Sequence, residues 1–392
     1  MRAAAFDLKS GLPNKQGVNL ILGRLTMMFL TAVSGSAITL LAQQSASGRT
    51  QRSEPPHPIS LPNVEDMAVL PGGRWLIASS MRSDDVKSGL YAVEMGTARF
   101  ERLYPDGGTA DKSLSSMPAA TPSGAACPGE LAPGAFSGHG ISYKPVSVRG
   151  GELYVVNHGG RESIEIFDVE LPHMARAMPR LRWKGCILAP AGTVGNAVTW
   201  TPDGRVYATV TPVVNGMPQP GDVRFWTPSA GWTHLAGSDV QVPAGIAASP
   251  AGDKIYVTSF LDRKVVEVSL GRFPERREVS VEFGADNVSL AKDGALLVGG
   301  LEGDPADIMR SCRGSNSPAC RFTGYVARVE PKSFHVTCTL ELGPTVTTTA
   351  TQVGNLLWLG SSRAPRIWRA PVAALKSCPG RIDVGAGTTG HE

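Results

Sequence analysis

A short pattern of hydrophobic and polar positions recurs along the chain. Each copy has a turn centred on glycine, then one or two polar residues, then a run of alternating or continuous apolar residues. Short apolar runs bounded by turn residues are typical of β-strands. Six copies can be counted, reading PGGRWLIASS, RGGELYVVNH, PDGRVYATV, AGDKIYVTS, KDGALLVGG and VGNLLWLGSS, with their glycines at Gly73, Gly151, Gly204, Gly252, Gly294 and Gly354.

The spacing of these copies predicts the architecture. A period of about 40 to 50 residues with several turn signals is typical of a propeller blade. We therefore predict an all-β fold, a six-bladed β-propeller, in which longer intervals are blades carrying insertions. The main insertion spans residues 106–138 and is expected to be a loop, and helix is expected only at residues 371–376.

An apolar segment precedes the repeats. Residues 25–42 read LTMMFLTAVSGSAITLLA and follow Lys9, Lys15 and Arg24, so they are a signal peptide or a single membrane anchor. The preceding positive charge directs the rest of the chain out of the cytoplasm. We expect a periplasmic, secreted or membrane-anchored protein that meets a membrane only through residues 25–42, if these remain uncleaved. The expected parts are residues 1–42 as signal or anchor, 43–60 as linker, 61–375 as propeller and 376–392 as tail.

Six cysteines in an exported chain suggest disulfides, because these persist in oxidising compartments. Cys312 and Cys320 are close enough in sequence to close one loop. For the other four, we expect Cys127 to pair with Cys186 and Cys338 with Cys378, although the sequence also allows other pairings and free buried thiols.

Composition, charge and the absence of certain motifs exclude several classes of function. Charged residues make up 18% of the chain and its formal net charge is only +4. No cluster of Lys and Arg is interleaved with aromatic residues, so nucleic acid is not expected as a partner. The sequence also contains no GxSxG, HExxH or Walker A motif. A serine hydrolase, a zinc protease of that class and a P-loop enzyme are therefore disfavoured.

Polar residues recur at one offset before the repeated turns, and equivalent strand positions of a propeller converge on its central channel. Eight residues before the turn glycine stand Glu65, Asn196 and Asp286, the last followed by Asn287, whereas the fourth repeat has Ala244 there. Carboxylate and amide oxygens are the ligands that calcium prefers. Asn and Asp also often cap strands and turns through their own backbone, and this alternative stays open for each residue.

At these residues the chain resembles the paraoxonase and arylesterase family of calcium-dependent lactonases, relatives of the gluconolactonase-like six-bladed propellers. The resemblance covers about residues 65–369, and its segments VEDMAVLPGG, SGHGIS, LYVVNHGG, GNAVTWTPDG, PAGIAASPAGDKIYV and ADNVSL occur in the family's order. It implies a catalytic calcium ion held by Glu65, Asn196, Asp286 and Asn287. It also implies a second, structural calcium ion at Asp66.

Two histidines lie in matching segments. The resemblance assigns catalytic roles to His139 and His158, with His158 as the neighbour that orients His139. An imidazole titrates near neutral pH, so His139 is the expected base that activates water. A packing histidine at a strand end is the alternative for His158. Glu162 and Glu165, which follow in sequence, are expected to face solvent.

The chain departs from the family pattern at two alanines. Ala197 stands where the family has a carboxylate ligand of the structural ion, and Ala244 where it has an asparagine ligand of the catalytic ion. The sequence therefore favours an exported calcium-dependent hydrolase of small lactones or aryl esters. The alternatives are a non-catalytic extracytoplasmic propeller used for binding or scaffolding, and a related propeller with a metal-independent reaction.

Overall fold

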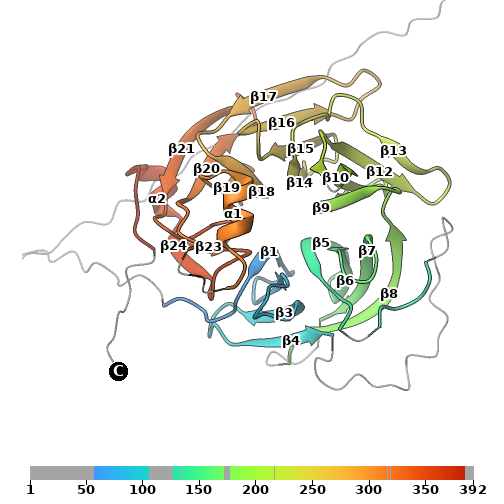
Figure 1. The fold of residues 1–392 in the computed structure, drawn as a ribbon, viewed down its shortest axis with the longest axis horizontal. Helices are drawn as coiled ribbons and strands as arrows, with labels where there is room; N and C mark the ends of the chain where they lie inside the picture. The colour runs from blue at the N-terminus through green and yellow to red at the C-terminus, as the bar shows by residue number, and fades with distance from the viewer. Residues whose placement is uncertain are drawn as a thin grey trace, which may run out of the picture. The chain divides into compact units, whose positions relative to one another are not determined.

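A computed structural model describes residues 57–105, 127–132, 134–171, 177–215, 217–315, 317 and 319–384. These residues form six antiparallel sheets arranged around a central axis, which confirms the predicted six-bladed propeller (Figure 1). The apolar segment 25–42 and residues 106–126 of the expected insertion lie outside the described residues. Within the described part, no helix is both long and apolar enough to cross a membrane.

The first three blades follow one another along the chain. Each has its first strand innermost and adds strands outward in sequence order. Blade 1 contains β1 (Val64–Val69), β2 (Trp75–Ser80), β3 (Gly89–Glu94) and β4 (Phe100–Tyr104); blade 2 contains β5 (Gly138–Ser147), β6 (Gly150–Asn157), β7 (Ser163–Glu170) and β8 (Arg180–Leu188); blade 3 contains β9 (Thr193–Trp200), β10 (Val206–Val214), β12 (Asp222–Thr227) and β13 (Gly231–His234), with the short β11 (Met217–Pro218) beside β10.

The last three blades repeat this order. Blade 4 contains β14 (Pro243–Ala248), β15 (Lys254–Ser259), β16 (Lys264–Ser269) and β17 (Arg276–Ser280); blade 5 contains β18 (Gly284–Leu290), β19 (Leu296–Leu301), β20 (Gly324–Glu330) and β21 (His335–Glu341); blade 6 contains β22 (Thr349–Val353), β23 (Leu356–Gly360) and β24 (Trp368–Pro371). Five of the six repeated glycines lie in the turn between the innermost strand of their blade and the second strand, and Gly151 is the second residue of β6. At Gly204 and Gly294 the φ angles are 89° and 84°, a backbone conformation that glycine adopts without steric cost.

The ring closes through the N-terminal side of blade 1. Ile59 and Ile367 exchange two backbone hydrogen bonds of 2.9 and 2.8 Å, so the segment before β1 pairs with the chain that enters β24. This pairing covers an edge that the three-stranded sixth sheet would otherwise expose.

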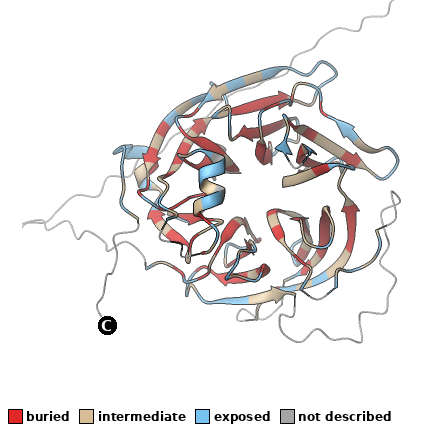
Figure 2. Cartoon of the chain, in the orientation of Figure 1, coloured by how far each residue is buried: buried red, intermediate tan, exposed pale blue. Residues whose placement is uncertain are grey.

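The core lies between adjacent blades. One cluster joins Ile77 and Leu90 of blade 1 to Leu153 and Phe167 of blade 2, and a similar cluster joins blades 4 and 5. The inner strands are therefore buried on both faces, whereas outer strands such as β4 and β17 carry exposed residues (Figure 2). The propeller is stabilised mainly by apolar contact between sheets.

The described residues include two short helices outside the six sheets. α2 (Ala373–Ser377) overlaps the helix expected at residues 371–376. α1 (Pro305–Ser311), inserted between β19 and β20, contradicts the expectation that helix occurs only there. The side chain of Asp304 accepts hydrogen bonds from the amides of Ala306 and Asp307, a normal N-cap. An Asp-Pro pair before a helical run was the sequence signal for this helix.

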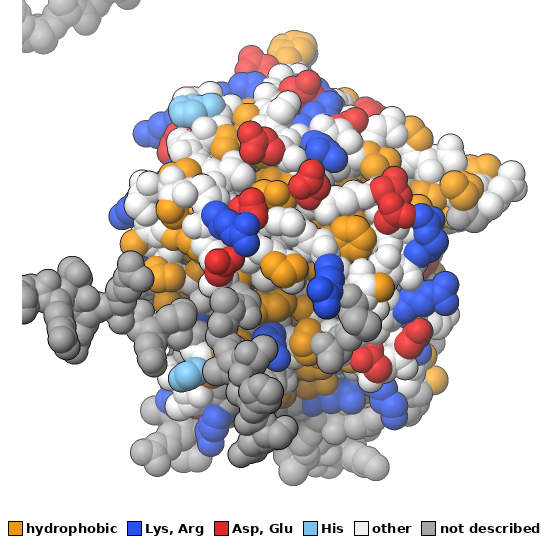
Figure 3. All heavy atoms as spheres, turned by 60° about the vertical axis from the view of Figure 1, so that its left-hand side comes forward, with side chains coloured by type: hydrophobic (Ala, Val, Ile, Leu, Met, Phe, Trp, Pro, Cys, Tyr) orange, Lys and Arg blue, Asp and Glu red, His pale blue; other side chains and the backbone are white. Residues whose placement is uncertain are grey.

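All six cysteines are paired in the structure. The disulfides are Cys127–Cys186, Cys312–Cys320 and Cys338–Cys378, as predicted. Three disulfides are compatible with an oxidising location outside the cytoplasm. On the face drawn in Figure 3, basic and acidic side chains are interspersed.

Candidate functional site

Backbone irregularities mark the inner ends of five blades. In β1, β5, β9, β14 and β18, the pairing with the second strand shifts register close to the start of the inner strand. A β-bulge of this kind re-aims side chains and is common near active sites. The residues at these shifts include those singled out by the offset from the repeated turns, namely Glu65, Asn196, Ala244 and Asp286 with the adjacent Asn287. The shift in β5 contains His139, which the resemblance singled out.

These bulges bring side chains from four blades to one cavity of about 700 Å³. Glu65, His139, Asn196 and Asp286 all line it. Asn287 does not; it is buried behind Glu65, and its Nδ2 donates hydrogen bonds to Glu65 Oε1 at 2.7 Å and to the Glu65 carbonyl at 3.1 Å. Asn287 therefore fixes the orientation of the Glu65 carboxylate.

Two oxygen atoms at the cavity lack partners. Glu65 Oε2 and Asn196 Oδ1 are buried and accept no hydrogen bond. Buried polar atoms are almost always paired, so an unpaired one requires an explanation such as an ion or water. Both atoms are hard oxygen donors, and the two residues reach the same cavity from β1 and β9. The donor set fits a calcium ion.

The acidic groups of the site affect one another. Burial raises the pKa of Asp286 well above its ordinary value, and the Glu65 and Asp66 carboxylates raise it further. Burial and then Glu65 raise the pKa of Asp66 to about 7, in spite of three hydrogen bonds that favour its charged form. A cation bound between such carboxylates would favour their charged forms.

Asp66 has its own protein partners. Its Oδ1 accepts a hydrogen bond from the Met67 amide at 2.8 Å and one from Thr349 Oγ1 at 3.2 Å, and its Oδ2 accepts from the Ile141 amide at 2.9 Å. Both oxygens are thus engaged in linking blade 1 to blades 2 and 6. A structural calcium ion at Asp66 stays a prediction, because these protein groups already hold its carboxylate.

The two histidines form a chain of contacts that ends on a carboxylate. His139 Nε2 lies 3.4 Å from Glu65 Oε1, and His139 Nδ1 lies 2.8 Å from His158 Nε2. His158 Nδ1 is in turn 2.9 Å from Glu162 Oε2 and 3.1 Å from Oε1. His158 is therefore not a histidine held by packing alone, because both of its ring nitrogens have polar partners.

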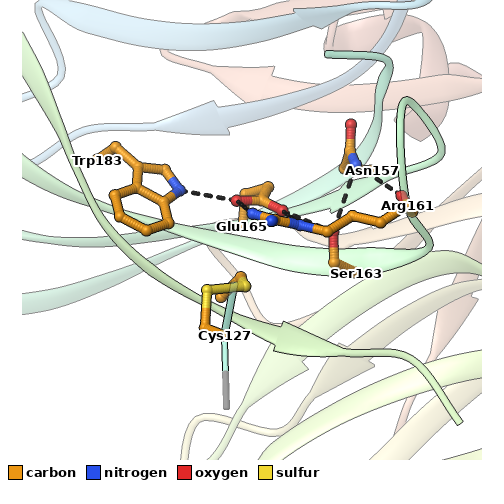
Figure 4. The surroundings of a disulfide bond; sticks show 7 residues. Cys127, Asn157, Arg161, Ser163, Glu165 and Trp183 are labelled. Carbon is orange, nitrogen blue, oxygen red and sulfur yellow. Dashed lines mark hydrogen bonds and ion pairs between the residues drawn. A yellow bond between two sulfur atoms is a disulfide. The ribbon is translucent and has the colours of Figure 1, made fainter. Parts of the chain in front are cut away.

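The interpretation of Glu165 as a solvent-facing residue was wrong, whereas Glu162 is partly exposed, with 32% of its side chain accessible. Glu162 holds His158, and Glu165 is fully buried. Glu165 accepts hydrogen bonds from Arg161, Ser163 and Trp183 beside the Cys127–Cys186 disulfide (Figure 4). The sequence did not reveal this cluster because both faces of β7 are covered by neighbouring blades, which removes the alternation typical of a half-exposed strand.

The two alanines that depart from the family pattern offer no side-chain oxygen to a metal ion. Ala197 and Ala244 are both buried, and Thr209 links them. Its Oγ1 accepts a hydrogen bond from the Ala197 amide at 2.9 Å and donates one to the Ala244 carbonyl at 2.7 Å. In the described part of the chain, no group of three or more His, Cys, Asp or Glu side chains is arranged to hold a metal ion. The candidate set combines two carboxylates, Glu65 and Asp286, with two amides.

Comparison with known proteins adds a structural context. No protein-family model and no curated protein sequence matches the chain. Proteins named as gluconolactonase and regucalcin are among its structural neighbours.

Three of these neighbours illustrate the extent of the similarity. A gluconolactonase from Xanthomonas campestris is 16% identical, with a TM-score of 0.48, over 80% of this chain and 87% of that chain. A putative gluconolactonase is 14% identical, with a TM-score of 0.47, over 79% and 89%. The calcium-binding protein regucalcin from Agrobacterium tumefaciens is 14% identical, with a TM-score of 0.45, over 83% and 88%. Function is inferred from the residues of this chain.

Proposed function

We propose that this protein is an exported hydrolase that cleaves small lactones or carboxylic esters at the cavity, with one calcium ion held by Glu65, Asn196, Asp286 and Asn287. The observation that carries the proposal is the pair of buried, unpaired oxygens, Glu65 Oε2 and Asn196 Oδ1, beside His139 in one cavity. Calcium, when bound there, would polarise the substrate carbonyl and stabilise the oxyanion that forms during attack. No second ion is proposed at Asp66.

The side chains would carry the proton transfers. His139 Nε2 would accept a proton from the attacking water and later give it to the alkoxide released when the carbon–oxygen bond breaks. The nearby Glu65 carboxylate, 3.4 Å away, would stabilise the protonated imidazole. His158 and Glu162 would hold the ring of His139 in one orientation through the contacts at its Nδ1.

Hydrolysis assays test this function. The purified protein should hydrolyse a neutral aryl ester and a γ- or δ-lactone, a chelator should abolish the activity, and calcium should restore it. His139→Gln should lower kcat by about 100-fold or more, the usual contribution of a general base. His335→Gln, on the exposed start of β21, is the matched control. Chelator-insensitive activity, or full activity of His139→Gln, would exclude the proposed mechanism.

The alternative is a non-catalytic binding propeller. Ala244 and Ala197 favour it, since neither offers a side-chain ligand and the Ala244 carbonyl already accepts a hydrogen bond from Thr209. Calcium binding without hydrolysis of any ester or lactone would support this alternative.

A further inference from the structure

Three arginines lie on the wall of the same cavity, and none of the proposed chemistry uses them. Arg82 comes from the loop between β2 and β3, Arg363 from the loop between β23 and β24, and Arg313 from the segment that follows α1. Blades 1, 5 and 6 thus each contribute one guanidinium group to the cavity. Three guanidinium groups that line one cavity repel one another, so their shared location suggests that they bind an anion.

The loops that carry these arginines are tied together. The Asp85 carboxylate accepts hydrogen bonds from the Ser315 amide at 2.9 Å and from Ser315 Oγ at 2.7 Å, which joins the loop of blade 1 to that of blade 5. These bonds lower the pKa of Asp85 to about 2. The Arg363 guanidinium reaches the Arg82 carbonyl at 3.4 Å. The arginines are therefore held on a connected rim.

Their charges are not neutralised by ion pairs. Arg363 donates to the carbonyls of Arg82 and Ser362, and Arg82 donates to those of Gly134 and Phe136. Among the described residues, neither these two nor Arg313 forms an ion pair with a carboxylate. Arginines elsewhere on the blades do form them, as Arg74 does with Glu94 and Arg277 with Glu267.

The charge of the cavity follows from this arrangement. Its acidic lining residues are Glu65, Asp84 and Asp286. If a divalent cation neutralises Glu65 and Asp286, Asp84 in the lining and the neighbouring Asp85 remain to balance three arginines. The cavity then has a net positive charge around its mouth, and a guanidinium fork is well suited to bind a carboxylate.

We propose that the cavity selects anionic substrates, namely esters or lactones that carry a carboxylate away from the reacting carbonyl, with Arg82, Arg313 and Arg363 binding that carboxylate. This inference rests on the proposed function for the reacting end of the substrate. The anionic end depends on the arginines and on a cation that neutralises Glu65 and Asp286. A neutral lactone or ester would offer the three guanidinium groups no anionic partner.

A matched pair of substrates tests the inference. The 4-nitrophenyl ester of pentanoic acid and the mono-4-nitrophenyl ester of glutaric acid differ only in a terminal methyl or carboxylate group. The wild-type protein should show a kcat/KM about tenfold or more higher for the glutarate ester, and added salt should reduce this preference. Arg363→Gln and Arg313→Gln should each lower this ratio of kcat/KM values by about fivefold or more.

The variants and controls separate folding from binding. Arg313 makes no hydrogen bond through its side chain that folding would lose within the described residues, so Arg313→Gln reports on the charge alone. Arg272→Gln is the control, because Arg272 is exposed between β16 and β17, beside the repeated turn at the other end of blade 4. Calorimetry with glutarate itself gives a second measurement that does not require hydrolysis.

The outcomes distinguish this inference from the proposed function. Arginine-dependent glutarate binding without hydrolysis of either ester would support the anion site and reject the hydrolase. Equal kcat/KM values for the two esters, or a glutarate preference unchanged in both arginine variants, would overturn the anion site while leaving the hydrolase intact.

Discussion

Individual side chains of the site have separable roles. Asn196 offers an oxygen that the fold itself does not use, whereas Asn287 donates its Nδ2 to the Glu65 carboxylate. His139 contacts the cavity, and His158 and Glu162 stand behind it. Removal of a ligand, of a base or of a positioning group should therefore have different consequences.

Glu162 acts in this account as a positioning residue for His158. Glu162→Gln should lower kcat by about tenfold and leave KM within about twofold, because removing an outer partner of this kind typically costs 10- to 100-fold. It should also change the pH dependence of kcat. Glu170→Gln, at the exposed end of β7, is the control. An unchanged kcat and pH profile would show that Glu162 has no functional link to His139.

Glu152 supplies a pH-dependent contribution to stability away from the cavity. Burial would raise its pKa, but hydrogen bonds from Lys184, Tyr154 and Lys144 outweigh burial and lower it from 4.5 to about 2. A depressed folded-state pKa stabilises the protein above the unfolded-state value, and this stabilisation is lost as the pH falls from about 4.5 to about 2.

Glu152→Gln should therefore reduce the free energy of unfolding by about 1 to 2 kcal/mol at pH 7. The difference from the wild type should shrink toward zero as the pH approaches 2. Denaturant unfolding at a series of pH values measures it. A difference that does not depend on pH would show that the charge of Glu152 is irrelevant.

For single residues, the sequence could predict which positions belong to the site but not which residues they contact. The offset of eight residues found Glu65, Asn196 and Asp286 because inner strands repeat the same geometry in each blade. It could not find Glu162 or the three rim arginines, since loops do not repeat and their contacts depend on distant segments. The hydrogen-bond partners of Asp66 come from two other blades, so local sequence could not reveal them either.

At the scale of elements, the site depends on close contact between inner strands. A Cβ at Gly140 would lie 2.6 Å from the Asn196 carbonyl oxygen and 2.7 Å from the Ala197 Cα, so only glycine lets β5 approach β9 in this way. These are backbone atoms, which cannot move aside as the end of a flexible side chain can.

Gly140→Ala should therefore push β5 and β9 apart. We expect a loss of about 1 to 3 kcal/mol in the free energy of unfolding, as for other overpacked sites, together with loss of hydrolysis. The matched control is Gly96→Ala, where a Cβ would have no neighbour within 4 Å. Wild-type stability and activity of Gly140→Ala would contradict this packing.

Most elements were predictable from the sequence, and the exceptions have physical causes. The six glycine turns identified six blades, because each turn needs a residue type that is readable locally. α1 was missed because it is a seven-residue insertion with no apolar period of its own. The bulges that aim the site residues were also missed, since register depends on both strands of a pair.

At the scale of the whole molecule, the ring creates the site. Blades 1, 2, 3 and 5 each supply one of the side chains Glu65, His139, Asn196 and Asp286 that meet at the cavity, and no blade alone brings two of them together. The pairing of Ile59 with Ile367 closes the circle that holds these blades in place. A ligand bound between blades should consequently stabilise the entire propeller, because its binding energy is lost on unfolding.

The most direct test of the account is the melting temperature of the purified protein with calcium and with a chelator, compared with that of Asn196→Ala. Calcium should raise the melting temperature of the wild type, and Asn196→Ala should lose most of this shift while melting like the wild type in chelator, because its Oδ1 has no partner in the fold. Equal melting temperatures of the wild type in calcium and chelator would contradict the metal centre.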